Sequence, residues 1–143
     1  MTTVDYLRQV RLLDLKINNK LVEIEQVKKL ICGISAINYD ERVQTTPNFD
    51  KIGLALCKVE KMEEKLNTLI DTYADTKETI IGQIESLENE IHRTILSMRY
   101  IEGKKITEIE DEVSYSYRNL QRHHNKAIQK FESMYGHLYL DER

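Results

Sequence analysis

Cationic and amide side chains gather in one stretch near the C-terminal end of this 143-residue chain. Between Tyr117 and Phe131 the sequence has four basic residues and no acidic one, although the whole chain carries a formal net charge of -3. Arginine, asparagine and glutamine present paired hydrogen-bonding groups that match guanine and adenine edges, and basic side chains neutralise phosphates. The stretch therefore predicts a surface that contacts double-stranded DNA.

Position along the expected helix separates two kinds of contact. Side chains in the first turns are placed to reach base edges, whereas those further along, and those at helix starts, are placed for phosphates. The candidates for base contact are Tyr117, Arg118, Asn119, Gln121 and Arg122, with Asn125 on the same face. The candidates for phosphate contact are Lys104, Lys105, Ser116, His123, Lys126 and Lys130.

A short helix is expected just before this basic stretch. Ile106, Ile109 and Val113 are three and four residues apart, so they share one helical face. Thr107 is placed as the N-cap of this helix, and Glu110, three residues later, completes a capping box.

The basic helix itself follows a tight turn. Ser116 is a natural N-cap for it. Its expected buried stripe consists of Leu120, His124, Ala127, Ile128 and Phe131. Another helix, over residues 87–101, precedes both and stops at Gly103, which suits a left-handed conformation. Three helices with a tight turn before the last are the layout of a helix-turn-helix that inserts its last helix into the major groove.

Two long helices are expected on the N-terminal side. In residues 4–37 apolar positions recur three and four apart, at Tyr6, Val10, Leu13, Ile17, Leu21, Ile24, Val27 and Ile31. From residue 50 the same spacing runs through Ile52, Leu56, Val59, Met62, Leu66, Leu69, Tyr73, Ile80, Ile84 and Leu87. Such seams are typical of a coiled coil. Residues 38–50 are expected to be the connecting loop, in which Pro47 ends the first helix and Asn48 or Asp50 caps the second.

The predicted fold is all-α. Folding back places Tyr6 opposite the region of Gly82, where the coiled coil runs out of partner and a bend is expected. We therefore predict a long antiparallel coiled-coil hairpin over residues 1–84 and a three-helix, helix-turn-helix domain over residues 85–143. The tail from Glu132 either continues the last helix or packs on the hairpin or on a second chain.

One set of residues carries a family resemblance. The pattern consists of Met98-Arg99-Tyr100, Gly103, Ile106 with Ile109, Ser116, Leu120 and Lys126-Ala127-Ile128. It resembles region 4 of sigma-70-type factors. The whole chain resembles short late transcription regulators of the ArpU and RinA type, from phages and prophages of Gram-positive bacteria. This resemblance implies a sigma-like helix-turn-helix that binds promoter DNA and activates late genes in the cytoplasm of a bacterial host, close to its nucleoid.

Other kinds of chemistry lack a recognisable pattern. The sequence has no glycine-rich phosphate loop, no Ser/His/Asp arrangement and no CxxC, so we expect neither an enzyme nor a cofactor. The adjacent His123 and His124 cannot chelate one metal from a helix, and Cys32 and Cys57 are expected to be buried free thiols. No apolar run approaches the ~20 residues that span a bilayer, and no signal peptide is recognisable, so we expect a cytoplasmic protein without a membrane partner.

The function predicted from these features is sequence-specific regulation of transcription. The coiled coil is expected to form a homodimer, because two helix-turn-helix units together read two half-sites, and RNA polymerase is a further expected partner. One alternative is the DNA-recognition subunit of a phage packaging terminase, which also joins a helix-turn-helix to an oligomerising coiled coil. A protein-interaction adaptor built on the coiled coil is the other.

Overall fold

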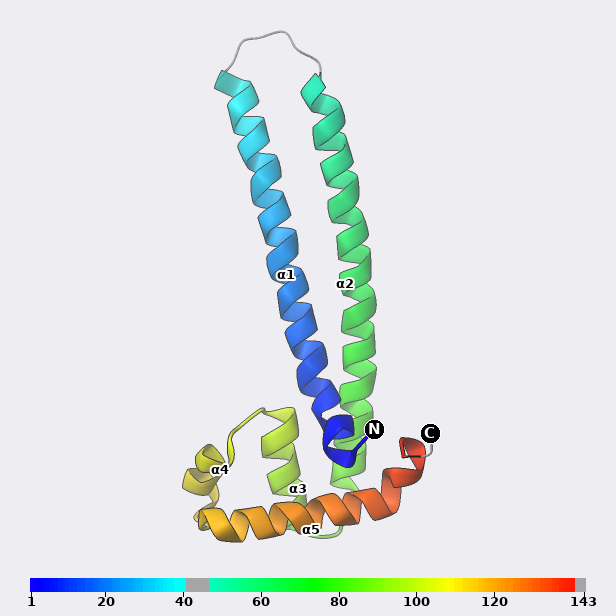
Figure 1. The fold of residues 1–143 in the computed structure, drawn as a ribbon, viewed down its shortest axis with the longest axis vertical. Helices are drawn as coiled ribbons and strands as arrows, with labels where there is room; N and C mark the ends of the chain where they lie inside the picture. Colours follow the sequence, from blue (N-terminus) through cyan, green and yellow to red (C-terminus); the bar gives the residue numbers. More distant parts are fainter. Residues whose placement is uncertain (41–46, 141–143) are drawn as a thin grey trace. The chain divides into compact units, whose positions relative to one another are not determined.

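The computed structural model describes residues 1–40 and 47–140, and these are almost entirely helical (Figure 1). The α-helices are α1 (Thr3–Asp40), α2 (Pro47–Glu85), α3 (Glu90–Leu96), α4 (Ile106–Val113) and α5 (Tyr117–Tyr135). A π-helical turn, Ser97–Ile101, continues α3, and a 3-10 turn, Gly136–Leu138, follows α5. No strand occurs in the described ranges, which confirms the all-helical prediction. None of the helices in these ranges combines the length and the apolar character needed to cross a membrane.

The ends of the two long helices differ from the prediction. The expected loop, residues 38–50, is shorter, because α1 continues through Asp40 and α2 begins at Pro47. Proline suits the first position of a helix, where its missing N–H has no intrahelical partner to lose. Asn48 and Asp50 therefore lie inside α2 instead of capping it.

The chain divides into two compact units, and the smaller one is Asp14–Thr72. In this unit α1 and α2 run side by side in opposite directions (Figure 1), and Lys28 Nζ forms an ion pair with Glu63 Oε1 at 3.0 Å. The buried apolar side chains of the unit are Ile17, Ile24, Val59 and Leu66. All four were predicted from the three–four spacing.

Several other side chains of this unit lie off the buried seam. Leu21 and Leu56 were predicted in it but are about half-exposed, and the partly buried neighbours are Lys20 and Ala55 instead. With Lys20 and Ala55 in these places, the seam keeps alternating steps of three and four residues, which Leu21 and Leu56 would interrupt. Cys32 and Cys57 are free, as predicted, but exposed, and the prediction that they are buried is wrong.

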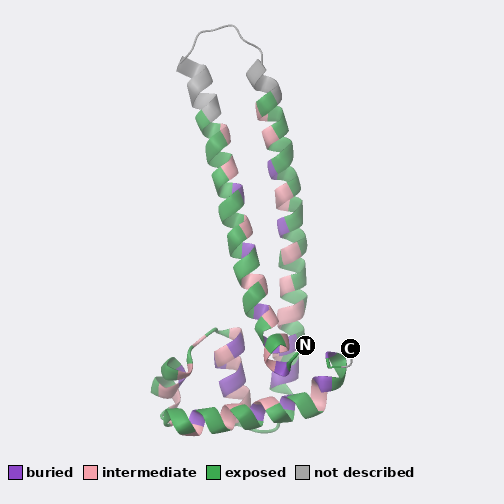
Figure 2. Ribbon diagram, viewed as in Figure 1, coloured by how far each residue is buried: buried purple, intermediate pink, exposed green. Residues whose placement is uncertain are grey.

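The larger unit consists of Met1–Leu13 together with Tyr73–Arg143. Its core joins side chains from α1, α2, α3 and α5 (Figure 2). The fully or almost fully buried members include Leu7, Ile80, Ile84, Leu96 and Phe131. These contacts make the start of α1 and the end of α2 part of the same unit as α3–α5, so the division differs from the predicted boundary at residue 84.

The pairing of the long helices at this end agrees with the prediction. Tyr6 Oη donates a hydrogen bond to Gln83 Oε1 at 3.0 Å, so Tyr6 lies opposite the region of Gly82 as predicted. Helix α2, however, continues through Gly82 and ends at Glu85, so the helix is not interrupted where the bend was expected. Leu87 is buried in the core but precedes α3. Asn89 is the N-cap of α3, since its side chain accepts a hydrogen bond from the N–H of Ile91 at 2.9 Å. Helix α3 thus starts later than the predicted residue 87.

The C-terminal tail completes the core of the larger unit. After α5, Tyr139 is buried and its ring stacks on Tyr6 with 4.4 Å between centroids. Tyr139 Oη donates to Thr3 Oγ1 at 3.0 Å, and the Thr3 hydroxyl in turn donates to Glu132 Oε2. Two of the alternatives left by the sequence therefore hold, because α5 continues through Tyr135 and Tyr139 then packs on the start of α1.

Candidate nucleic-acid interface

A small second core fixes the last helices to α3. Ile95 and Met98 pack with Ile109 of α4 and Leu120 of α5, and all four are buried. Ile106 and Val113 are packed against this cluster from the same face of α4, as their spacing predicted. The result is a rigid base for α4 and α5, because apolar side chains from three elements close on one another.

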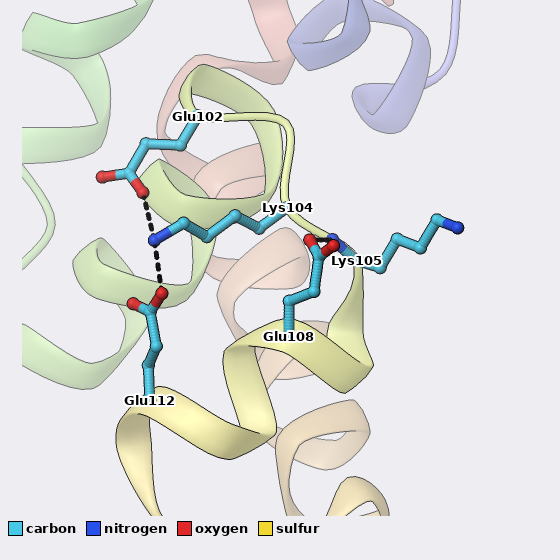
Figure 3. Close-up of polar contacts among 5 residues, drawn as sticks. All are labelled: Glu102, Lys104, Lys105, Glu108 and Glu112. Carbon is cyan, nitrogen blue, oxygen red and sulfur yellow. Dashed lines mark hydrogen bonds and ion pairs between the residues drawn. The ribbon is translucent and has the colours of Figure 1, made fainter.

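The turn into α4 begins at Gly103, whose φ of +73° confirms the predicted left-handed stop. Helix α4 begins at Ile106, where the backbone N–H of Lys105 donates to Glu108 Oε2 at 2.9 Å (Figure 3). The predicted cap at Thr107 is therefore wrong. An acidic side chain in the first turn reaches back to the residue before the helix, and Thr107 lies within the helix.

Lys104 is tied down by acidic neighbours. Its Nζ lies 2.9 Å from Glu102 Oε2 and 2.7 Å from Glu112 Oε1 (Figure 3). Hydrogen bonds to Glu112 and Glu102 raise the pKa of Lys104, so its ammonium group stays charged but is offset by two carboxylates. This pairing argues against the predicted phosphate contact. Lys105 is exposed and its ammonium group points away from these carboxylates.

The turn between α4 and α5 has two defining residues. Ser114 adopts the left-handed conformation with φ 58°, and its N–H donates to the carbonyl of Glu110 at 3.2 Å. Ser116 Oγ accepts a hydrogen bond from the N–H of Asn119 at 3.3 Å. The predicted N-cap of α5 is confirmed, and the helix begins at Tyr117.

The inner face of α5 is the predicted stripe. Leu120, Ala127 and Phe131 are buried. His124 is half-buried, with its Nε2 2.8 Å from Tyr100 Oη, a hydrogen-bonding distance. Burial, aided by the nearby charge of Arg99, lowers the pKa of His124. The structural role predicted for this histidine therefore agrees with its surroundings.

The outer face of α5 brings six of the predicted contact residues together. They line one shallow hollow and are Ser116, Arg118, Asn119, Gln121, Arg122 and Asn125. Both arginines are exposed, and within the described residues neither forms an ion pair with a carboxylate. Among the described residues, Arg122 forms one long side-chain hydrogen bond, which its Nη2 donates to Asn119 Oδ1 at 3.5 Å. Tyr117, exposed at the start of the helix, accepts a hydrogen bond from Gln121 Nε2 at 2.9 Å.

His123 lies in different surroundings from those predicted. Its half-buried ring lies 5.6 Å from the ring of Tyr115 and 6.2 Å from that of His92, measured between centroids. These ring contacts hold it between α5, the preceding turn and α3, which argues against a phosphate contact made by His123 alone. Lys126 and Lys130, by contrast, are exposed as predicted.

His92 is the neighbour that sequence reasoning missed. It faces a groove shared with Asn89, Lys126 and Lys130, although it lies on a different helix. Burial, together with the charges of His123 and Lys126, lowers the pKa of His92. Spacing within one helix cannot reveal such a neighbour, because the two histidines meet only through the packing of α3 on α5.

Metal binding is not supported by the described geometry. Within residues 1–40 and 47–140, no three side chains of the His, Cys, Asp or Glu type come together in a way that could hold a metal ion.

Residues 49–132 match the profile of a family described as a protein of unknown function, DUF1492. The matched region covers more than half of the 143-residue chain and includes α3, α4 and most of α5. No curated protein and no solved structure matches the chain.

Proposed function

The chain belongs to the DUF1492 family, and because that family has no assigned function, we propose one from the geometry of α4 and α5. The protein is a sequence-specific DNA-binding regulator of transcription. Helix α4, the turn through Ser116 and helix α5 act as a helix-turn-helix that inserts α5 into the major groove. The observation that carries this proposal is the open cationic face of α5, where Arg118 and Arg122 are exposed without a carboxylate partner in the described chain.

The charge of the two helices supports this assignment. Helix α4 carries the acidic residues Glu108, Glu110, Asp111 and Glu112. The acid-free stretch of α5 ends at Glu132, and that carboxylate accepts a hydrogen bond from the hydroxyl of Thr3. Basic side chains without an acidic one between them are thereby gathered on α5, which is the footprint expected for binding a phosphate backbone.

The resemblance to sigma-70 region 4 and to the ArpU and RinA type regulators supports a more specific proposal. The target is promoter DNA of late phage or prophage genes in the host cytoplasm, and RNA polymerase is the second partner. Helix α5 also suits the role of a recognition helix. It is 19 residues long, and its Ser116 cap places Arg118 and Arg122 in the first turns, which are those that reach base edges.

The decisive experiment replaces the two arginines. Arg118→Ala and Arg122→Ala are each expected to lose ~1–3 kcal/mol of discrimination between a selected duplex and a scrambled one. Fluorescence anisotropy with a duplex obtained by in vitro selection measures this difference, and circular dichroism checks that the helices remain. Lys65→Ala, an exposed lysine of α2, is the matched control and should change nothing. Unchanged discrimination in both arginine variants would remove the proposed reading surface.

Self-association through the long helices forms the second part of the proposal. Leu15, Val22 and Leu30 of α1 are 44%, 53% and 67% exposed, and spacings of seven and eight residues place them on one helical face. An exposed apolar stripe of this kind is typical of a surface that another helix covers. A second copy of this chain fits, because a dimer presents two DNA-binding units to two half-sites.

Light scattering at micromolar concentration tests the dimer. The wild-type chain is expected to have twice the monomer mass, and Val22→Glu combined with Leu30→Glu should halve it. Lys16→Glu, at an exposed position of α1 about a quarter turn away from this stripe, changes the net charge by the same amount and is the matched control. A wild-type monomer would contradict the dimer, whereas a ring of eight or more chains would instead favour the terminase-type recognition subunit.

A further inference from the structure

A groove with two free lysines lies beside the proposed reading surface. It runs between the start of α3 and the second half of α5, and Asn89, His92, Lys126 and Lys130 line it. Both lysines are exposed, and neither has a carboxylate within ion-pairing distance in the described part of the chain. Glu88 is the one acidic side chain on its lining. The groove therefore carries an excess of positive charge.

Further donors accompany these charges. The Asn89 side chain uses its oxygen to cap α3, which leaves its amide N–H groups as donors. Gln129, on the same groove, supplies a second amide. The lowered pKa of His92 is in keeping with positive surroundings, because His123 and Lys126 are among its causes after burial. Donors and cations with little competing negative charge are what an anionic oxygen requires.

The length of α5 separates this groove from the reading surface. Helix α5 has 19 residues, which corresponds to about 28 Å at ~1.5 Å per residue. The major groove is only ~12 Å wide, so the first turns of α5 can enter it while the later turns extend past its edge. Lys130 lies about 18 Å along the axis from Arg118, at the same rise per residue. A side chain at that distance is placed beside the sugar–phosphate backbone instead of the base edges.

We propose that the groove of Asn89, His92, Lys126 and Lys130 is a second DNA-contact surface, which binds backbone phosphates flanking the sequence read by Arg118 and Arg122. This inference rests on the proposed DNA-binding function. The occupant is a DNA strand and not a free anion, because Arg118, Arg122, Lys126 and Lys130 follow one another at four-residue intervals. They form a row of cations that continues from the reading surface into the groove.

The test uses two duplexes with the same selected site. One ends at the site, and the other extends it by one helical turn on each side. On the extended duplex, Lys130→Ala should reduce the slope of log K against log salt concentration by about 0.9, the value for one lost phosphate contact. On the short duplex the slope should not change. Lys65→Ala, an exposed lysine outside the groove, is the matched control on both duplexes.

The outcomes separate this inference from the function on which it rests. Wild-type protein that binds neither duplex at low salt would defeat the DNA-binding proposal itself. Tight, arginine-dependent binding with no effect of Lys130→Ala on the extended duplex would defeat only the groove, and so would an equal loss on both duplexes. A titration with inorganic phosphate, followed by the NMR signals of His92, identifies the remaining alternative. Saturation below millimolar phosphate without DNA would make this a free-anion site and overturn the assignment to the backbone.

Discussion

The two compact units bury their apolar side chains to different extents. In the larger unit, Leu7, Ile80, Leu96 and Phe131 have no exposed surface. In Asp14–Thr72, the buried side chains keep 5–9% of theirs, as Ile24 and Ile17 illustrate. The physical reason is the number of helices that surround each set of apolar side chains. Side chains from four helices and the tail share the core that contains Phe131, whereas a pair of helices can cover a seam from only one side.

This difference suggests separate tasks for the units. A closed core holds the α5 face in a fixed orientation, which the proposed contact with base edges would require. Outside its seam, the smaller unit leaves large apolar side chains such as Leu30 and Leu54 mostly exposed, at 67% and 72%. That surface is better explained by a partner helix than by the needs of a monomer. Substitutions in each unit can now measure how far the contrast extends.

The largest expected effect is in the closed core. Phe131→Ala should lower the free energy of unfolding of the larger unit by ~3–5 kcal/mol, because it removes a fully buried ring and leaves a cavity. Chemical denaturation followed by circular dichroism measures the loss. Leu138→Ala, 55% exposed in the same unit, is the control and should cost little. Equal losses in the two variants would contradict the closed core.

A smaller effect is expected from the same kind of change in the seam. Leu66→Ala should cost about 2 kcal/mol, the lower end of the range for buried leucine, because this side chain keeps 7% of its surface exposed in a seam between two helices. Hydrogen exchange of amides in Asp14–Thr72 reports the loss in that unit alone. Asn67→Ala, at an exposed position next to Leu66, serves as the control. A loss as large as that of Phe131→Ala would erase the contrast between the units.

Local patterns predicted those parts of the molecule that depend on neighbours a few residues away. The spacing of Leu120, Ala127 and Phe131 identified the inner face of α5, and Ser116 and Gly103 marked helix ends correctly. Each of these depends on one turn of backbone, where period and capping chemistry dominate. The outer face of α5 followed directly, since residues opposite a buried stripe are exposed.

Features that arise from long-range packing were not predictable in this way. Leu7 and Phe131 lie in the same core although almost the whole chain separates them. A boundary drawn at residue 84 along the sequence therefore assigned them to different units. The sequence indicates a free cation at Lys104, but in the folded chain its Nζ forms an ion pair with Glu112, eight residues away. His92 shows no informative spacing at all. Which charges remain free depends on how elements meet, and a single sequence does not specify that.

The smallest expected effect is a dependence of stability on pH, and it should occur only in the larger unit, which contains the histidines. The sequence has no histidine between residues 14 and 72, whereas the larger unit contains the half-buried His124. Burial and Arg99 lower the pKa of His124 below its ordinary value of 6.5, so the unfolded chain takes up this proton first as the pH falls. The larger unit should therefore lose stability as the pH falls below about 6.5. His92, whose pKa is also lowered, acts in the same direction.

Hydrogen exchange at pH 7.5 and 5.5, corrected for intrinsic rates, separates the two units in the full-length chain. Protection should fall more in the larger unit than in Asp14–Thr72. His124→Gln should reduce the fall, because it removes the titrating group while keeping a hydrogen-bonding partner for Tyr100. His137→Gln, an exposed histidine of the same unit, is the matched control and should leave the fall unchanged. If both units lost protection equally, or if His124→Gln behaved like the control, burial of His124 would not be the source of the pH dependence.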